Sequence, residues 1–201
     1  MYGIYKNGSV IAQFAAPMSV TSNVPVFIGD AQSLKRTVVR RPAQRWEIST
    51  NLSPLSYGAE ELFTLMVTHG HFSPIEVIMP QNYGTLASRS FKLSPSNYTV
   101  TGLKDQETVV IVNQNSYYIP SGTFIKFSSH DKIYVTTNSL QAGAQGLSIF
   151  PKLRQTISGD TFTAGDDVIG KFFFDTDTII GMSYTDGILM DNGTIKLIEA
   201  L

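Results

Sequence analysis

The sequence predicts a mainly β protein, in which a small β-barrel is inserted into a larger β domain that carries one helix. β-favouring residues are abundant, with 12 Phe and 9 Tyr beside many Val, Ile and Thr. Hairpin turn dipeptides separate the apolar runs, as at Asn7-Gly8, Asp186-Gly187 and Asn192-Gly193. Only residues 56–70 combine apolar residues with a helical period.

The composition excludes several classes of protein. In 201 residues, 42% are hydrophobic and 15% are charged, which is enough apolar material for a core and too little charge for a disordered chain. The absence of cysteine excludes disulfides, thiol catalysis and thiolate metal sites. A formal net charge of -1 gives no overall attraction to nucleic acid or anionic lipid. No apolar run suggests a membrane span or a signal peptide, so we expect a protein made in a cytoplasm.

Residues 1–84 predict strands around a single helix. Trp46, Ile48 and Thr50 alternate with polar residues, as in a half-buried strand. The helix is predicted to begin near Ser56 and to end at Gly70. Its apolar stripe is predicted to consist of Ala59, Leu62, Phe63, Met66 and Val67.

Residues 85–155 contain no helical stripe and instead predict a small closed barrel. Turns that carry Gly or Pro separate about six short strands, at 88–93, 97–101, 108–113, 122–128, 131–137 and 146–150. Residues 156–201 return to alternating β patterns. The predicted organisation is therefore an outer β domain of residues 1–84 and 156–201, with residues 85–155 inserted in one of its loops.

The histidines raise the question of catalysis or metal binding. His130 and Asp131 are adjacent, but neighbours on a strand point to opposite faces, and "FSSHDKIY" fits the turn of a hairpin. His69 and His71 have a spacing that can bind zinc, yet they fall at a helix end, where histidine complements the dipole. We expect structural roles for all of them.

No other pattern supports a catalytic, cofactor-binding or metal-binding residue. The chain lacks a phosphate-binding glycine loop and a nucleophile motif. Seven aspartates of the second half adjoin predicted turns, where their side chains can bond to the backbone. They are Asp160, Asp166, Asp167, Asp175, Asp177, Asp186 and Asp191.

One stretch is strongly cationic. It holds Lys35, Arg36, Arg40, Arg41 and Arg45, and no acid follows Lys35 until Glu47. Nucleic-acid binding, a subunit contact and a solvated face are all compatible with it. We favour the subunit contact, formed by Arg40, Arg41, Arg45 and Trp46.

The aromatic residues of the inserted barrel leave a second function open. Stacking of bases or sugars on them would make the barrel an OB-type module that binds single-stranded nucleic acid or host glycan. Packing in the core is the simpler interpretation, because no basic groove accompanies them. The residues are Phe91, Tyr98, Tyr117, Tyr118, Phe124, Phe127 and Tyr134.

Several of these segments together resemble the distal tail or baseplate-hub proteins of tailed bacteriophages. The resemblance is carried by "AQRWEISTNLSPLSYGAEELFTLM", "PIEVIMPQNYG", "YIPSGTFIKFSSHDKIYVTT" and "LSIFPKLRQTI". The closing "DTIIGMSYTDGILMDNGTIKLIEAL" is also similar to them. The likeness covers residues 24–201 and contains no catalytic motif.

This resemblance implies a structural virion protein with a β-barrel collar domain and an inserted OB-like barrel. The collar domains would assemble into a homo-hexameric ring in the tail, built in the host bacterial cytoplasm. The ring would join the tail tube protein to the baseplate or tail-tip hub protein. It implies no enzyme activity, no cofactor, no membrane partner and no specific binding of nucleic acid.

Overall fold

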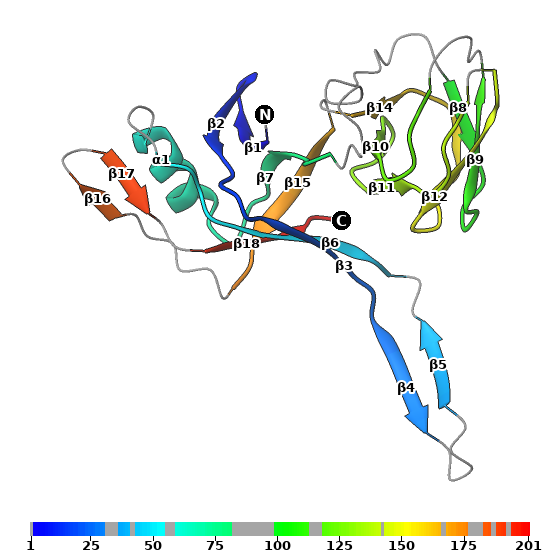
Figure 1. The fold of residues 1–201 in the computed structure, drawn as a ribbon, viewed down its shortest axis with the longest axis horizontal. Helices are drawn as coiled ribbons and strands as arrows, with labels where there is room; N and C mark the ends of the chain where they lie inside the picture. The colour runs from blue at the N-terminus through cyan, green and yellow to red at the C-terminus, as the bar shows by residue number, and fades with distance from the viewer. Residues whose placement is uncertain are drawn as a thin grey trace.

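The computed structural model describes residues 2–30, 36–40, 43–54, 59–81, 99–112, 118–141, 143–165, 168–176, 183–185, 188–191 and 194–201. They form two seven-stranded sheets, two separate two-stranded hairpins and one helix (Figure 1). The predicted mainly β fold with a single helix is confirmed. Within the described residues, the helix is too short to cross a membrane.

The first sheet is antiparallel throughout and has the strand order β2-β1-β7-β15-β18-β6-β3. The β1–β2 turn is Asn7-Gly8, with φ of 50° and 90°, which is the predicted two-residue hairpin turn. The strands are β1 (Gly3–Lys6), β2 (Ser9–Gln13), β3 (Ser19–Asn23), β6 (Arg45–Thr50), β7 (Ile75–Ile78), β15 (Ile169–Phe174) and β18 (Ile195–Glu199).

Helix α1 (Ala59–His69) packs on the first sheet through Ala59, Leu62, Leu65 and Met66. Gly70 ends it as predicted, with φ of 48° and its N–H donating to the Met66 carbonyl at 2.8 Å.

The predicted apolar stripe of α1 is wrong in two places. Phe63 and Val67 are 47% and 59% exposed, and Leu65 is buried instead. The helical period allows a stripe on either side of Leu62 and Met66, and only the docking of the helix on the sheet decides between them. The predicted start at Ser56 lies outside the described residues.

The second sheet has the strand order β13-β8-β9-β12-β11-β10-β14. Its two edge strands are consecutive in sequence, because only Thr161 separates β13 from β14. The sheet therefore curls until its edges approach each other, and it has more strands than the five of a simple OB fold. The strands are β8 (Thr99–Gly102), β9 (Thr108–Val112), β10 (Phe124–Phe127), β11 (Ile133–Thr136), β12 (Gly146–Phe150), β13 (Ile157–Asp160) and β14 (Phe162–Ala164).

The second sheet extends beyond the segment that the sequence assigns to it. All its strands fall between β7 and β15, which pair with each other in the first sheet. However, β13 and β14 lie after residue 155, in the segment assigned to the outer domain. The predicted strand at 88–93 lies outside the described residues.

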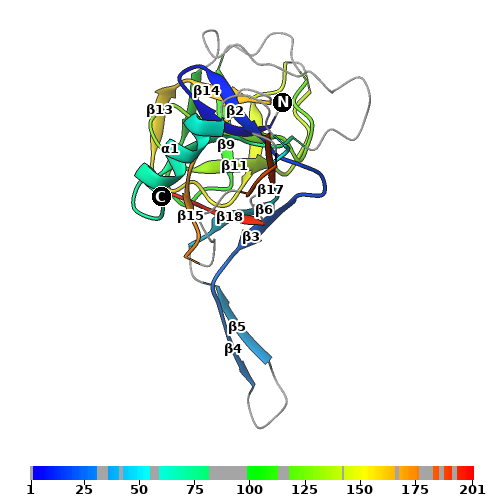
Figure 2. The ribbon, with the colours of Figure 1, turned by 90° about the vertical axis from the view of Figure 1, so that its left-hand side faces the viewer.

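Two short hairpins stand apart from the sheets. Hairpin β4 (Val26–Asp30) with β5 (Arg36–Arg40) continues the line of β3 and β6 and projects from the body in both ribbon views (Figures 1 and 2). The other consists of β16 (Ser183–Thr185) and β17 (Ile188–Asp191).

The cores of the two sheets meet where β10 and β11 cross β15. Phe124 and Ile133, from the second sheet, pack in the core of the first. Gln81 adds a polar connection here, because its amide accepts from the Phe124 N–H at 2.9 Å and donates to the Gly165 carbonyl at 2.6 Å.

Gly170→Ala should destabilise this crossing. A Cβ at Gly170 would lie 2.3 Å from Ile133 Cδ1 and 2.7 Å from Phe172 Cε2. We expect urea unfolding to show a loss of about 1–3 kcal/mol from overpacking. Gly146→Ala is the matched control, because its nearest neighbour would be Thr108 Cγ2 at 3.8 Å. Equal stability of the two variants would contradict the tight crossing.

Candidate functional site

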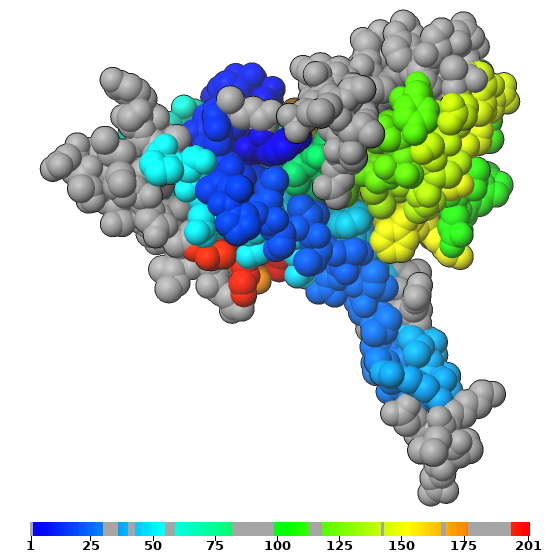
Figure 3. Space-filling model, viewed as in Figure 1, coloured from blue at the N-terminus to red at the C-terminus, as the bar shows by residue number. Residues whose placement is uncertain are grey.

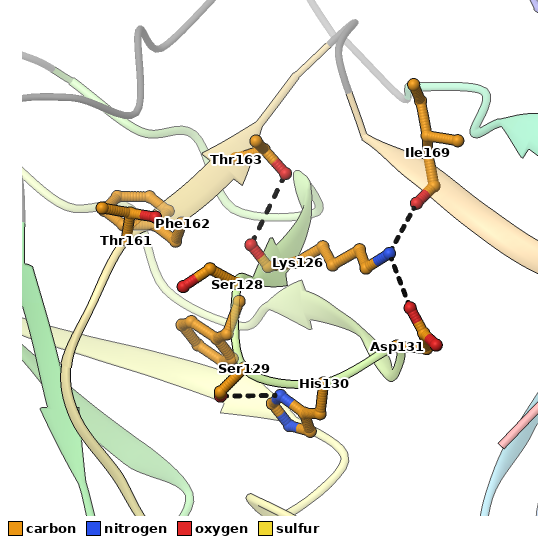
Figure 4. A pocket seen from close by; sticks show the side chains of 10 residues that line it. Lys126, Ser128, Ser129, His130, Asp131, Thr161, Phe162, Thr163 and Ile169 are labelled. Carbon is orange, nitrogen blue, oxygen red and sulfur yellow. Dashed lines mark hydrogen bonds and ion pairs between the residues drawn. The ribbon is translucent and has the colours of Figure 1, made fainter. Parts of the chain in front are cut away.

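The His130-Asp131 pair lies in the connection between β10 and β11, which is the hairpin that the sequence predicts. The turn itself is Ser128-Ser129, and the pair follows it. It borders an open hollow of about 450 Å³ (Figure 4). The other lining residues are Lys126, Phe127, Ser128, Ser129, Thr161, Phe162, Thr163 and Ile169.

Asp131 connects this turn to the first sheet. Its carboxylate accepts from Lys126 Nζ at 3.0 Å and from Lys171 Nζ, on β15, at 2.9 Å. Lys126 Nζ also donates to the Ile169 carbonyl at 3.2 Å (Figure 4). The Lys171 hydrogen bond, supported by Lys126, holds the pKa of Asp131 below its usual value. The carboxylate is thus an ionised connector rather than a base for His130.

His130 is held by its neighbours in one orientation. Tyr134 Oη accepts from the Arg154 N–H at 3.0 Å, so its own hydrogen is available for His130 Nε2 at 2.8 Å. Nδ1 then carries the ring proton and faces Ser129 Oγ at 3.4 Å. Burial lowers the pKa of His130 and raises that of Tyr134 to about 12, which favours this neutral arrangement. With both ring nitrogens engaged, His130 supports the turn.

The other histidines and the described aspartates do not come together in a shared site. His71 Nδ1 lies 3.1 Å from the Phe174 carbonyl oxygen, whereas His69 Nδ1 is buried without a partner. In the part of the chain that the structure describes, no group of three or more His, Asp or Glu side chains could hold a metal ion. Four of the seven aspartates, Asp166, Asp167, Asp177 and Asp186, lie outside that part.

The barrel aromatics that the structure describes are mostly core. Phe124, Phe127 and Tyr134 are buried, and Tyr118 is exposed. Phe91, Tyr98 and Tyr117 lie outside the described residues. Core packing is thus the role of the three buried rings.

A buried carboxylate joins the two sheets. Glu199, at the end of β18, is 1% exposed. Its Oε2 accepts from Lys132 Nζ at 2.5 Å and from the Trp46 N–H at 3.0 Å, and its Oε1 accepts from the Ile133 N–H at 2.8 Å. One side chain of the first sheet thereby fixes β6 and the start of β11.

Gln44 and Trp46 complete this polar junction. Gln44 Oε1 accepts from Lys132 Nζ at 2.5 Å, and Gln44 Nε2 donates to Ser22 Oγ at 3.0 Å. Trp46 Nε1 donates to the Ile133 carbonyl at 2.9 Å. Its ring is 6% exposed and packs edge-on against Phe124, with centroids 5.2 Å apart. We call Gln44, Trp46, Lys132 and Glu199 the polar junction.

The polar junction lies at the root of the projecting hairpin. β3 and β6 pair up to Asn23 and Arg45, and the hairpin resumes pairing at Val26 and Arg40. Between these two paired regions the sequence has two residues after Asn23 and four residues before Arg45. The unequal numbers interrupt the regular strand pairing there. Gln44 is in the longer side and is fixed by Lys132 and Ser22.

Hairpin β4–β5 exposes apolar side chains on both of its faces. The exposed fractions of Val26, Phe27, Ile28, Val38 and Val39 lie between 45% and 61%. The register pairs Phe27 with Val39 and Ile28 with Val38, and successive pairs point to opposite faces. Figure 3 shows this arm standing clear of the body. Among the described residues, none of these five side chains belongs to a core cluster.

The four predicted contact residues fall into different environments. Arg45 is exposed at the root of the hairpin, and Arg40 is the last residue of β5. Arg41 lies outside the described residues. Trp46 is buried within this chain, so its indole serves the contact between the two sheets. A role for the arginines in a subunit interface stays a prediction.

The sequence reasoning missed Lys132, Gln44 and Glu199. Glu199 follows Ile195 and Leu197 at a period of two, on the buried face of β18. That alternation was a signal for a buried acid. Its partners, Trp46, Lys132 and Ile133, are far away in the sequence and give no local signal.

Comparison with known proteins does not assign this arrangement to a family. The chain matches no family model and no curated protein.

Lys132→Met should destabilise the protein by about 3–5 kcal/mol, because it removes the buried donor that binds both the Glu199 carboxylate and the Gln44 amide oxygen. Adding Glu199→Gln should recover most of this loss, since the amide oxygen still accepts a hydrogen bond and no charge remains. Urea unfolding measures both. Lys171→Met is the control: its ion pair with Asp131 has side chains 44% and 42% exposed, so we expect a loss of ~0–1 kcal/mol. Additive losses in the double variant would contradict the coupling.

The polar junction should also make stability depend on pH in the alkaline range. Burial lowers the pKa of Lys132 to about 8 from 10.5, and Glu199 opposes this only in part. Between pH 8 and pH 10.5, Lys132 holds its proton in the unfolded chain and has lost it in the folded chain. The free energy of unfolding therefore rises with pH across this range, and this gain is lost as pH falls through 8.

The measurement compares the wild type with Lys132→Met/Glu199→Gln, which lacks both titrating groups. From pH 8 to pH 10.5, the wild type should gain up to ~3 kcal/mol relative to this variant. A difference that stays constant across this range would show that Lys132 titrates normally.

Proposed function

We propose that this chain is a structural virion protein whose copies form a ring in the tail of a bacteriophage. The ring is an adaptor between the tail tube and the baseplate or tail-tip hub. Two lines of argument support this: the ordered motifs over residues 24–201 that resemble such tail proteins, and the exposed apolar hairpin β4–β5.

The hairpin is the observation that carries the proposal. An isolated two-stranded hairpin is only marginally stable in water. This one extends from the body with apolar pairs on both faces, such as Phe27 with Val39. Contiguous exposed apolar surface of this kind marks contacts with other chains. A second copy of the same chain is the simplest partner, and a repeated head-to-tail contact closes into a ring.

The polar junction supports the same function. A ring closes only if every copy presents its arm at the same angle. Glu199 binds the Trp46 N–H, and Gln44 is fixed between Lys132 and Ser22, so the root of the hairpin is tied to both sheets. The number of copies, six, and the tube and hub partners come from the resemblance.

Replacing both Phe27 and Val39 by Asp should prevent assembly while leaving the body folded. Burying two such side chains contributes about 3 kcal/mol or more, so we expect half-assembly to need at least ~100-fold more protein. Light scattering after size exclusion, over a concentration series, measures the mass, and thermal unfolding checks the body.

Leu103→Asp is the matched control, because Leu103 is an equally exposed apolar residue in the loop between β8 and β9, away from the hairpin. It should assemble like the wild type. A wild type that stays monomeric at every concentration would refute the ring. So would a hairpin variant that assembles normally.

A further inference from the structure

The outer face of α1 is a second exposed apolar surface. Phe63 and Val67 lie one helical turn apart on it, and Phe72, just beyond the helix, is 93% exposed. The hydroxyls of Thr64 and Thr68, on the same face, donate back to the carbonyls of Glu60 and Thr64 at 2.8 and 2.6 Å. These hydroxyls are satisfied inside the helix, so this face offers water few polar groups.

Helix α1 therefore exposes two large apolar side chains, Phe63 and Val67, beside the polar Glu60, Thr64 and Thr68. Its inner face is buried through Leu62, Leu65 and Met66. Large apolar side chains grouped on an exposed face mark contacts with other chains. Phe63 and Val67 remain exposed in the single chain, which indicates a covering partner from outside it.

We propose that the outer face of α1 receives the β4–β5 hairpin of a neighbouring copy. The proposal rests on the ring assembly above and identifies the receiving surface. Figure 1 shows the hairpin extending beyond the ends of β3 and β6 and directed away from α1. The hairpin of one chain thus cannot reach the α1 face of the same chain, whereas each copy in a ring can bind the hairpin of its neighbour.

The charges of the two surfaces are complementary. The hairpin and its root contain Arg36, Arg40 and Arg45, and Arg36 and Arg45 are exposed. Helix α1 has no Lys or Arg, and its first turn carries Glu60 and Glu61. Glu61 lies 3.5 Å from Lys6 of the same chain, while Glu60 is exposed beside the apolar face. Opposite charges next to matching apolar patches favour one register of docking.

Cysteine cross-linking tests the proposal directly, since the chain has no cysteine of its own. Thr37→Cys places a thiol on the hairpin face of Phe27 and Val39. Thr64→Cys places one on the outer face of α1. Both positions are exposed, and both variants keep every apolar side chain of the contact. The two single variants are mixed and treated with a short bis-maleimide.

We expect mixed dimers at least about tenfold above those from a control mixture, in which Leu103→Cys replaces Thr64→Cys. A single chain carrying Thr37→Cys and Thr64→Cys should give a ladder that ends at the ring size. In addition, Phe63→Asp/Val67→Asp should raise the concentration for half-assembly as the hairpin variant does.

The outcomes separate the two proposals. If the wild type assembles but cross-linking stays at the control level, or Phe63→Asp/Val67→Asp assembles normally, the helix face is not the receiving surface. The outer face of α1 would then bind a different tail protein, and the proposed ring assembly would be unaffected. If the wild type does not assemble, both proposals fall.

Discussion

The arrangement of this molecule depends on one buried carboxylate. Glu199 comes from the last strand of the chain, yet it binds the ammonium of Lys132 and the backbone N–H groups of Trp46 and Ile133. Burying such a pair costs desolvation energy and stabilises less than apolar packing would. The pair instead fixes how the strands lie: the ion pair and the two backbone hydrogen bonds of Glu199 hold β18 against β6 and the start of β11. Because Trp46 is the second residue of β6, that placement also fixes the root of hairpin β4–β5.

Two regions depart from the usual pattern of buried apolar and exposed polar side chains. Charged and amide groups are buried at the polar junction, whereas Phe27, Ile28 and Val39 are exposed on the arm. The first arrangement gives a defined geometry, and the second leaves large apolar side chains exposed on the arm. An apolar arm on a fixed root is suited to repeated contacts between copies. The side chains of His130 and Asp131, by contrast, are engaged in hydrogen bonds and ion pairs within the chain.

Local signals predicted local structure well. The Asn7-Gly8 turn, the helix end at Gly70 and the turn before His130 follow from dipeptides and periodicity, because each depends on neighbouring residues. The predictions failed where contacts between distant segments determine the structure. The assignment of β13 and β14 depends on pairing with β8 and β10, and the exposure of Phe63 depends on how α1 docks. Glu199 and Trp46 are 153 residues apart, so their contact has no local pattern.

Amide hydrogen exchange as a function of protein concentration tests the central claim, that the arm is buried only by another copy. The account predicts that the amides of Val26–Asp30 and Arg36–Arg40 exchange quickly in dilute protein and become protected as the chain assembles. The amides of Ile133–Thr136, inside the body, should be equally protected at every concentration. Arm amides that exchange at the same rate in monomer and assembly would contradict it.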